Sequence, residues 1–135
     1  MKKELRDAND EVFFRVEADK GNGWIRGCWY GTASVEQAKS VGLLYVECLQ
    51  RTPYSKILND TRYYTGPFLD INEWLERVFI PPAVQAGLSC FVDLVPQGQP
   101  NRLAAEDFRR RVQGSFKAHI YDNEEEAMEW LRNCR

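Results

Sequence analysis

The 135-residue chain contains a single histidine, His119, and no two cysteines at the C-x-x-C spacing. Zinc sites need several His or Cys ligands, usually close together in the sequence, so this composition gives no recognisable zinc site. The four cysteines are Cys28, Cys48, Cys90 and Cys134. Three of them lie among apolar neighbours, and we expect reduced thiols that act as small core residues.

The chain also lacks the motifs of well-marked enzyme classes. It has no P-loop, no G-x-G-x-x-G dinucleotide fingerprint, no G-x-S-x-G nucleophile elbow and no H-E-x-x-H zinc motif. Its glycines occur instead at expected turns and helix ends. We therefore predict a protein that is not an enzyme and has no metal or cofactor. The remaining alternative is an unrecognised enzyme that uses Asp60 and Arg62.

Neither an excess of one charge nor a long apolar run is present. The net charge is −2 and the sequence pI is about 5.5, so no global field attracts nucleic acid or an anionic membrane. No segment approaches the roughly 18 to 20 apolar residues that span a bilayer. The basic start, residues 1–6, is not followed by the apolar stretch of a signal peptide. We expect a cytoplasmic protein with no nucleic-acid partner and no stable membrane insertion.

What the chain does contain is an alternation of strand and helix patterns. Residues 1–10 are polar and are predicted to form a flexible N-terminus. Residues 11–135 are predicted to form one domain, whose length suits a single buried core. Alternating patterns predict strands at residues 11–18 and 116–121, and the turn at residues 19–23 predicts a return strand at 24–30. A brief strand is expected at 56–59, and residues 88–95, apolar on both faces, are typical of a central parallel strand. Period-3.6 patterns predict helices at residues 35–50, 70–86, 102–113 and 122–134.

Capping residues support three of these helices. Ser34 with Gln37, Asp70 with Glu73, and Asp122 with Glu125 each match the capping-box spacing. Pro81-Pro82 lies inside the second helix and predicts a kink, or a break followed by a short helix.

The resulting order, β-β-α-β-α-β-α-β-α, predicts an α/β fold. Its sheet is mixed and mostly parallel, with five strands, an N-terminal β-hairpin and four helices. Right-handed crossovers leave only the first strand antiparallel. The hairpin aromatics Trp24, Trp29 and Tyr30 do not share one alternating face. Some aromatic surface must therefore be covered, either by a helix or by a second subunit in a homodimer formed through Trp24 and Trp29.

The most functional-looking cluster is Asn59-Asp60-Thr61-Arg62, expected at the carboxyl end of a strand, where ligands of α/β sheets collect. Asp60 could accept hydrogen bonds from backbone amides, Thr61 could take a phosphate, and Arg62 could pair with an anion. The alternative is an Asx-turn that only closes the strand. Phe68 and Trp74 follow nearby, and they indicate either a ligand pocket or a loop folded onto its own helix.

Three other groups have simpler interpretations. The basic triplet Arg109–Arg111 spreads around a helix and is expected to be a solvated face. His119 has no Ser or Cys partner nearby that would make it catalytic. Glu124–Glu126 lies in the first turn of a helix, where the helix dipole favours carboxylates.

With these residues in place, the chain resembles the STAS domain, the fold of anti-sigma-factor antagonists. The resemblance depends on a hairpin leading into strand–helix units, with Leu58-Asn59-Asp60-Thr61 ending the third strand. Later segments are similar to a bacterial STAS-like subgroup related to the CRAL-TRIO lipid-exchange fold: Asn72-Glu73-Trp74, Pro82–Gly87 before Leu88, and the closing helix from Tyr121-Asp122 to Trp130-Leu131.

This resemblance implies a regulatory module that binds another protein or itself. In the regulatory members an Asp precedes a phosphorylated Ser at a helix start. Asp60 matches that Asp, and Thr61 is the nearest hydroxyl. Here the next helix is expected only from about Asp70, so helix-start geometry for a phosphate is missing. The alternative implied by the lipid-exchange relatives is a small-ligand or lipid-binding domain with a shallow pocket beside the 59–68 loop.

Overall fold

The computed structural model describes residues 1–67 and 69–135, and it is an α/β fold built on one mixed sheet. Over these residues the sheet has six strands in the order β1-β2-β3-β4-β5-β6. The strands are β1 (Lys2–Arg6), β2 (Val12–Asp19), β3 (Trp24–Gly31), β4 (Lys56–Tyr64), β5 (Cys90–Leu94) and β6 (Lys117–Tyr121). Strands β3 to β6 are parallel, and β2 runs against both of its neighbours. The expected fold class is confirmed.

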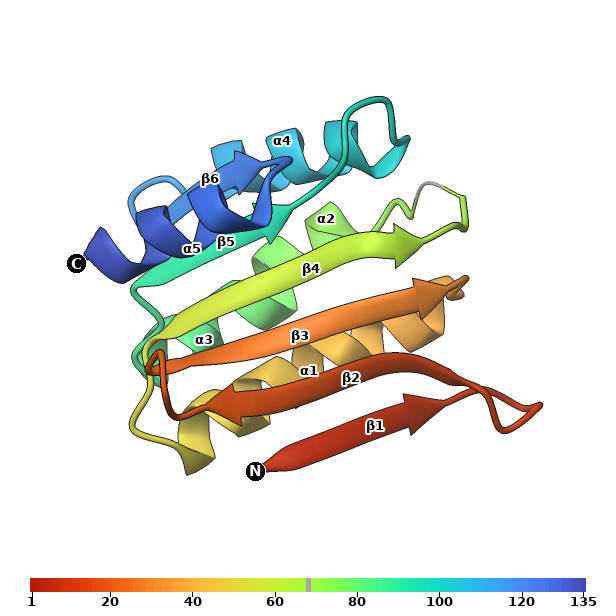
Figure 1. Cartoon of the computed structure of the whole chain (residues 1–135), viewed down its shortest axis with the longest axis horizontal. Coiled ribbons are helices and arrows are strands. Elements are labelled where there is room, and N and C mark those ends of the chain that lie inside the picture. The colour runs from red at the N-terminus through yellow and green to blue at the C-terminus, as the bar shows by residue number, and fades with distance from the viewer. Residues whose placement is uncertain (68) are drawn as a thin grey trace.

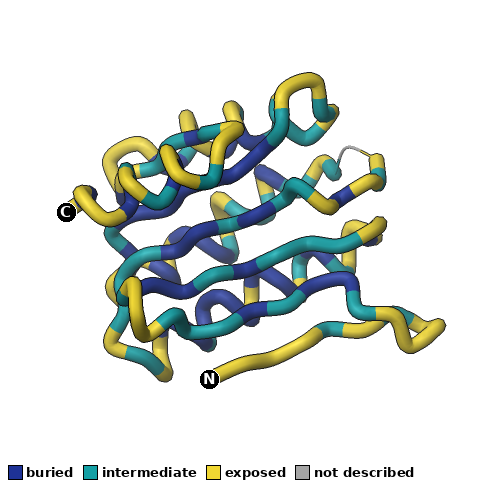
Figure 2. Tube along the Cα trace, in the orientation of Figure 1, coloured by how far each residue is buried: buried dark blue, intermediate teal, exposed yellow. Residues whose placement is uncertain are grey.

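The expected count of five strands is wrong, because residues 2–6 form β1 at the edge of the sheet. This strand pairs antiparallel with β2, so that Lys3 lies opposite Val16 and Leu5 opposite Phe14. Leu5 packs against the main core, while most of the strand is exposed (Figure 2). The charged side chains of residues 2–6 resemble those of a flexible terminus in the sequence. They are also typical of an edge strand, because charges there discourage pairing with another chain.

The helices cover the two faces of the sheet unequally (Figure 1). They are α1 (Val35–Arg51), α2 (Asn72–Trp74), the π-helical turn η1 (Leu75–Phe79), α3 (Ile80–Gln85), α4 (Asn101–Arg111) and α5 (Glu124–Asn133). Successive right-handed crossovers in one direction place α1, the α2–α3 segment and α4 on the same face. Helix α5 follows the last strand and packs on the opposite face.

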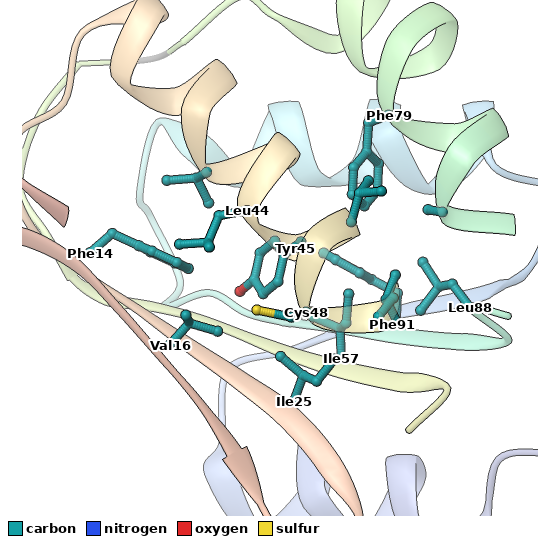
Figure 3. Close-up of a cluster of buried hydrophobic side chains, with 14 of the residues drawn as sticks. Phe14, Val16, Ile25, Leu44, Tyr45, Cys48, Ile57, Phe79, Leu88 and Phe91 are labelled. Carbon is teal, nitrogen blue, oxygen red and sulfur yellow. The ribbon is translucent and has the colours of Figure 1, made fainter. Parts of the chain in front are cut away.

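Each face has its own apolar core. The larger one lies between the sheet and α1, and includes Phe14, Tyr45, Phe79 and Phe91 (Figure 3). The smaller one lies under α5 and contains Trp24, Leu58, Cys90, Val92, Leu94, Ala127, Leu131 and Cys134.

The helix starts agree with the sequence in one case out of three. The Ser34–Gln37 capping box is present. The N-cap of the last helix lies one residue later than expected, because the Asn123 side chain, and not that of Asp122, accepts a hydrogen bond from the Glu126 amide. Asp70 makes no cap, since α2 begins after Ile71, which has no side-chain cap bond.

The expected kink or break at Pro81-Pro82 takes the form of a π-helical turn within a continuous helical segment. Prolines donate no backbone hydrogen bond, so they interrupt the α-helical ladder. Just before them, the Ile80 amide bonds to the Leu75 carbonyl, five residues back. Such single π turns occur often near functional sites.

The cysteines depart from expectation, because Cys90 and Cys134 form a disulfide with a Cα–Cα distance of 6.3 Å. Cys90 opens β5, and Cys134 directly follows α5, which packs over that strand. Lys56 anchors the same helix end by donating to the Leu131 carbonyl at 2.7 Å. Cys28 and Cys48 are free thiols.

Among the described residues, none of the helices has both the length and the hydrophobicity required to cross a membrane.

Candidate functional site

The Asn59–Arg62 cluster lies inside a strand and not in a turn. Strand β4 continues to Tyr64, well past the expected end at Asn59. It pairs with β3 on one side, with a one-residue bulge after Asp60, and with β5 on the other. Successive side chains of a strand point to opposite faces. Asn59 and Thr61 therefore face α1, whereas Asp60 and Arg62 face α5, and the predicted cluster is divided between two sites.

On the α1 face, a cavity of about 140 Å³ lies between the sheet, α1, the α2–η1 segment and α4. Its lining is mainly apolar, with aromatic rings from strands and helices: Trp29, Tyr45, Tyr64, Phe79, Phe91 and Phe108. At the sheet side it has a set of polar groups, which we call the polar floor: Trp29, Tyr45, Asn59, Thr61 and Asp93. Apolar walls with a few convergent polar groups are typical of small-molecule sites.

Asn59 is the centre of the polar floor. Its Oδ1 accepts hydrogen bonds from the Trp29 indole N–H at 2.8 Å and from the Tyr45 hydroxyl at 2.7 Å. Its Nδ2 donates to Asp93 Oδ1 at 2.8 Å. Because an indole N–H can only donate, Trp29 determines which end of the Asn59 amide faces Asp93.

Asp93 is a carboxyl group buried to an unusual degree, with only 7% of the residue exposed. Burial raises its pKa to about 7, against the smaller opposite effect of the hydrogen bond from Asn59. Burial also raises the pKa of Tyr45 well above its ordinary value, so this phenol stays neutral. A buried carboxyl that titrates near neutrality in a cavity is a feature of functional sites.

Thr61 lines the same cavity from the middle of β4. Its hydroxyl donates to the Leu94 carbonyl at 3.0 Å. The neighbouring backbone is extended, without the helix start that accepts a phosphate in the regulatory STAS domains.

On the α5 face, Asp60 is fully buried between two arginines. Arg62 binds it through two hydrogen bonds of 3.0 and 2.8 Å, and Arg26 through one of 3.1 Å. Glu124 of α5 accepts from both arginines. Burial alone would raise the pKa of Asp60, but the bonds and charge of Arg62, assisted by Arg26, hold it below its ordinary value. This network joins β3, β4 and α5. Arg62, which was expected to bind an anion, is already paired with Asp60 and Glu124.

Of the remaining predicted site residues, Trp29 lines the cavity, Trp24 and Trp74 do not, and Phe68 lies outside the described residues. Trp74 packs on α1, where its ring lies 5.6 Å from the Lys39 ammonium, and Leu75 takes the cavity-lining position. Trp24 is fully buried under α5, so the helix, of the two expected alternatives, covers it. Trp29 lines the cavity and is partly buried, and self-association through the two tryptophans stays a prediction.

The sequence analysis missed Asp93 and Tyr45 as site residues. Asp93 had a visible signal, because it is the one charged residue in the apolar stretch 88–95. Such a carboxyl on a central strand has to be buried, and buried carboxyls need a partner or a role. Tyr45 belongs to the buried stripe of its helix, and nothing in that stripe marks its hydroxyl.

Comparison with known proteins yields a fold and no family. No protein-family model and no curated protein matches the chain. A crystal structure from Shewanella loihica PV-4, an uncharacterised protein of the DUF3478 family with a SpoIIAA-like fold, superposes with a TM-score of 0.54. The match covers 86% of this chain and 90% of that protein at 15% sequence identity. The resemblance expected from the sequence is confirmed at this level, and the chain has a SpoIIAA-like, STAS-like α/β fold.

Proposed function

We propose that this STAS-like domain binds a small molecule in the cavity between its sheet and α1. The observation that carries the proposal is the polar floor inside an otherwise apolar cavity. This is the small-ligand alternative of the sequence analysis, with the pocket moved from the 59–68 loop to the interior. A cavity of comparable size in another protein binds benzene, so we expect a ligand of about six to ten non-hydrogen atoms.

The cavity has an energetic cost that supports this proposal. Protein interiors are packed as densely as organic crystals. The side chains that line the cavity therefore lack packing partners on its inner side. The alanines Ala38 and Ala105 line the cavity, and larger side chains there would fill it. A bound ligand would recover the lost contacts.

The proposal can be tested by NMR with a fragment library. The Trp29 indole N–H is a direct reporter, because it forms part of the polar floor. We expect apolar fragments with one polar group to shift this signal and the Asn59 side-chain amide signals. Ala38→Leu should abolish the shifts, since Ala38 is 2% exposed and lines the cavity. Ala8→Leu, at an exposed turn, is the matched control. If no fragment shifts these signals in the wild type, the proposal is wrong.

A second candidate function is the regulatory protein-interaction module. It is supported by a row of stacked side chains on the α5 face, where Tyr30 and Tyr63 stack at 5.9 Å between centroids. Arg15 lies 5.5 Å from the Tyr30 ring and Arg62 5.3 Å from the Tyr63 ring. Tyr63 is 53% exposed, and such amphipathic aromatics are enriched in protein interfaces.

Self-association through this row is measurable by sedimentation velocity over a range of concentrations. We expect Tyr63→Ser to weaken any dimer. Leu103→Ser should leave it unchanged, because Leu103 is also exposed, at 71%, but lies on α4. A monomer at every concentration would contradict self-association.

A further inference from the structure

We propose that the ligand of the cavity is a small protonated amine, whose ammonium group pairs with the Asp93 carboxylate while its hydrocarbon part lies among the aromatic walls. This inference rests on the proposed ligand-binding function and specifies the chemical class. It follows from hydrogen-bond accounting, from the charge of the lining and from the arrangement of the rings.

The polar floor has used almost all of its own donors. The Trp29 indole N–H and the Tyr45 hydroxyl both donate to Asn59. The Thr61 hydroxyl donates to a backbone carbonyl. Asn59 donates one of its two amide hydrogens to Asp93, which leaves its other hydrogen as the spare donor of the floor.

The hydrogen-bonding groups of the polar floor that remain available to a ligand are mainly acceptors. Among the described residues, Asp93 Oδ2 has no hydrogen-bond partner, although its residue is more than nine-tenths buried. Tyr45 and Thr61 each retain oxygen lone pairs after donating their hydroxyl hydrogens. A ligand complementary to this floor must therefore bring several donors, and an ammonium group brings three.

The charge of the lining favours a cation. Among the described lining residues, Asp93 is the one with an acidic or basic side chain; Tyr45 and Tyr64 are the other titratable groups. Burial raises the pKa of both phenols, so they remain neutral near pH 7. A buried carboxylate without a cationic partner is costly, and a ligand cation would supply that partner.

Within the part of the chain that the structure describes, no lysine or arginine side chain lines the cavity. Arg102 of α4 donates to the Val95 carbonyl and pairs with Glu106. Helix α4 contributes Ala104, Ala105 and Phe108, and η1 contributes Leu75 and Phe79. Asp107 lies behind Asn72, which donates to it, and it is paired with Arg111. The aromatic walls add attraction for a cation positioned over a ring face.

The test compares three probes that share one ring: benzylamine, benzyl alcohol and benzoate, titrated by calorimetry at about pH 8. We expect benzylamine to bind at least about tenfold more tightly than benzyl alcohol, which corresponds to one ion pair of modest strength. Benzoate should not bind. In Asp93→Asn, the ratio of the benzylamine affinity to the benzyl alcohol affinity should fall to about one. Because the wild-type carboxyl must ionise, benzylamine should bind about tenfold more weakly at pH 6 than at pH 8.

The outcomes separate this inference from the function on which it rests. Equal binding of benzylamine and benzyl alcohol would overturn the amine assignment and leave the cavity as a binding site. An amine advantage that persists in Asp93→Asn would also overturn it. If none of the probes binds and the fragment experiment is negative as well, both proposals are wrong.

Discussion

The hydroxyl of Tyr45 occupies the space that a Cβ atom would take at Gly27. An ideal Cβ built on Gly27 would overlap the Tyr45 hydroxyl and would lie 2.6 Å from Phe14 Cζ. The missing side chain lets the tyrosine ring of α1 lie over β3, beside Phe14 (Figure 3), and reach Asn59 on β4. Gly27 therefore permits the hydrogen bond that completes the polar floor.

Substitution of this glycine should affect stability through Tyr45. We expect Gly27→Ala to lower the free energy of unfolding by about 2 to 4 kcal/mol, from overpacking and the lost hydrogen bond. The double variant Gly27→Ala/Tyr45→Phe should be destabilised by less than the sum of the single variants, because the hydroxyl no longer conflicts with the new methyl group. Urea denaturation of the four proteins provides the measurement. Strict additivity would contradict the described contact.

The raised pKa of Asp93 predicts an unusual dependence of stability on pH. The folded-state pKa of about 7 exceeds the ordinary value of 3.8, so the folded protein holds a proton that the unfolded chain releases. The contribution of Asp93 to the free energy of unfolding is therefore greatest below about pH 4. It falls by about 4 kcal/mol as the pH rises from about 4 to about 7. Asp93→Asn should remove this decline and be more stable than wild type at about pH 8. Denaturation at several pH values, with carboxyl NMR titration, measures both effects; an Asp93 pKa near 4 would refute the assignment.

Asp60 should show the opposite behaviour. Its pKa is held below the ordinary value, so its contribution to stability is present above about pH 4 and is lost as pH falls through the lowered pKa. At neutral pH we expect Asp60→Asn to cost roughly 3 kcal/mol, since it leaves two partly buried arginines with Glu124 as their remaining acidic partner. Glu124→Gln is the matched control and should cost no more than about 1 kcal/mol, because this carboxylate is partly exposed. If the two substitutions lower the free energy of unfolding equally, the burial of Asp60 does not explain its contribution to stability.

The disulfide predicts a dependence on reductant. Cys90 and Cys134 are 44 residues apart, and closing a loop of this length stabilises a protein by about 4 kcal/mol in the chain-entropy model. We expect reductant to lower the melting temperature of the wild type and to leave the Cys90→Ser/Cys134→Ser variant unchanged. Mass spectrometry after thiol alkylation should find two free cysteines in the untreated protein. Four alkylated cysteines would show that the bond does not form.

The sequence by itself determined the types and the order of the elements from β2 onward. The alternation of residues 11–18, the Ser34–Gln37 capping box and the apolar stretch before Val95 are each formed within a few residues. Such local patterns suffice for an α/β class with parallel crossovers. The edge strand at residues 2–6 was missed because its pattern is polar on the exposed side and depends on β2 for pairing.

The tertiary structure alone decided which groups meet. Asn59 and Asp93 are 34 residues apart and come together through the β4–β5 register. Tyr45 reaches Asn59 only because α1 packs over Gly27. The division of Asn59–Arg62 between two faces requires β4 to continue past Asn59, where Thr61, Tyr63 and Tyr64 find partners in β3 and the Leu94 carbonyl. These pairings depend on strand register and helix docking between distant segments, which no window of local sequence contains.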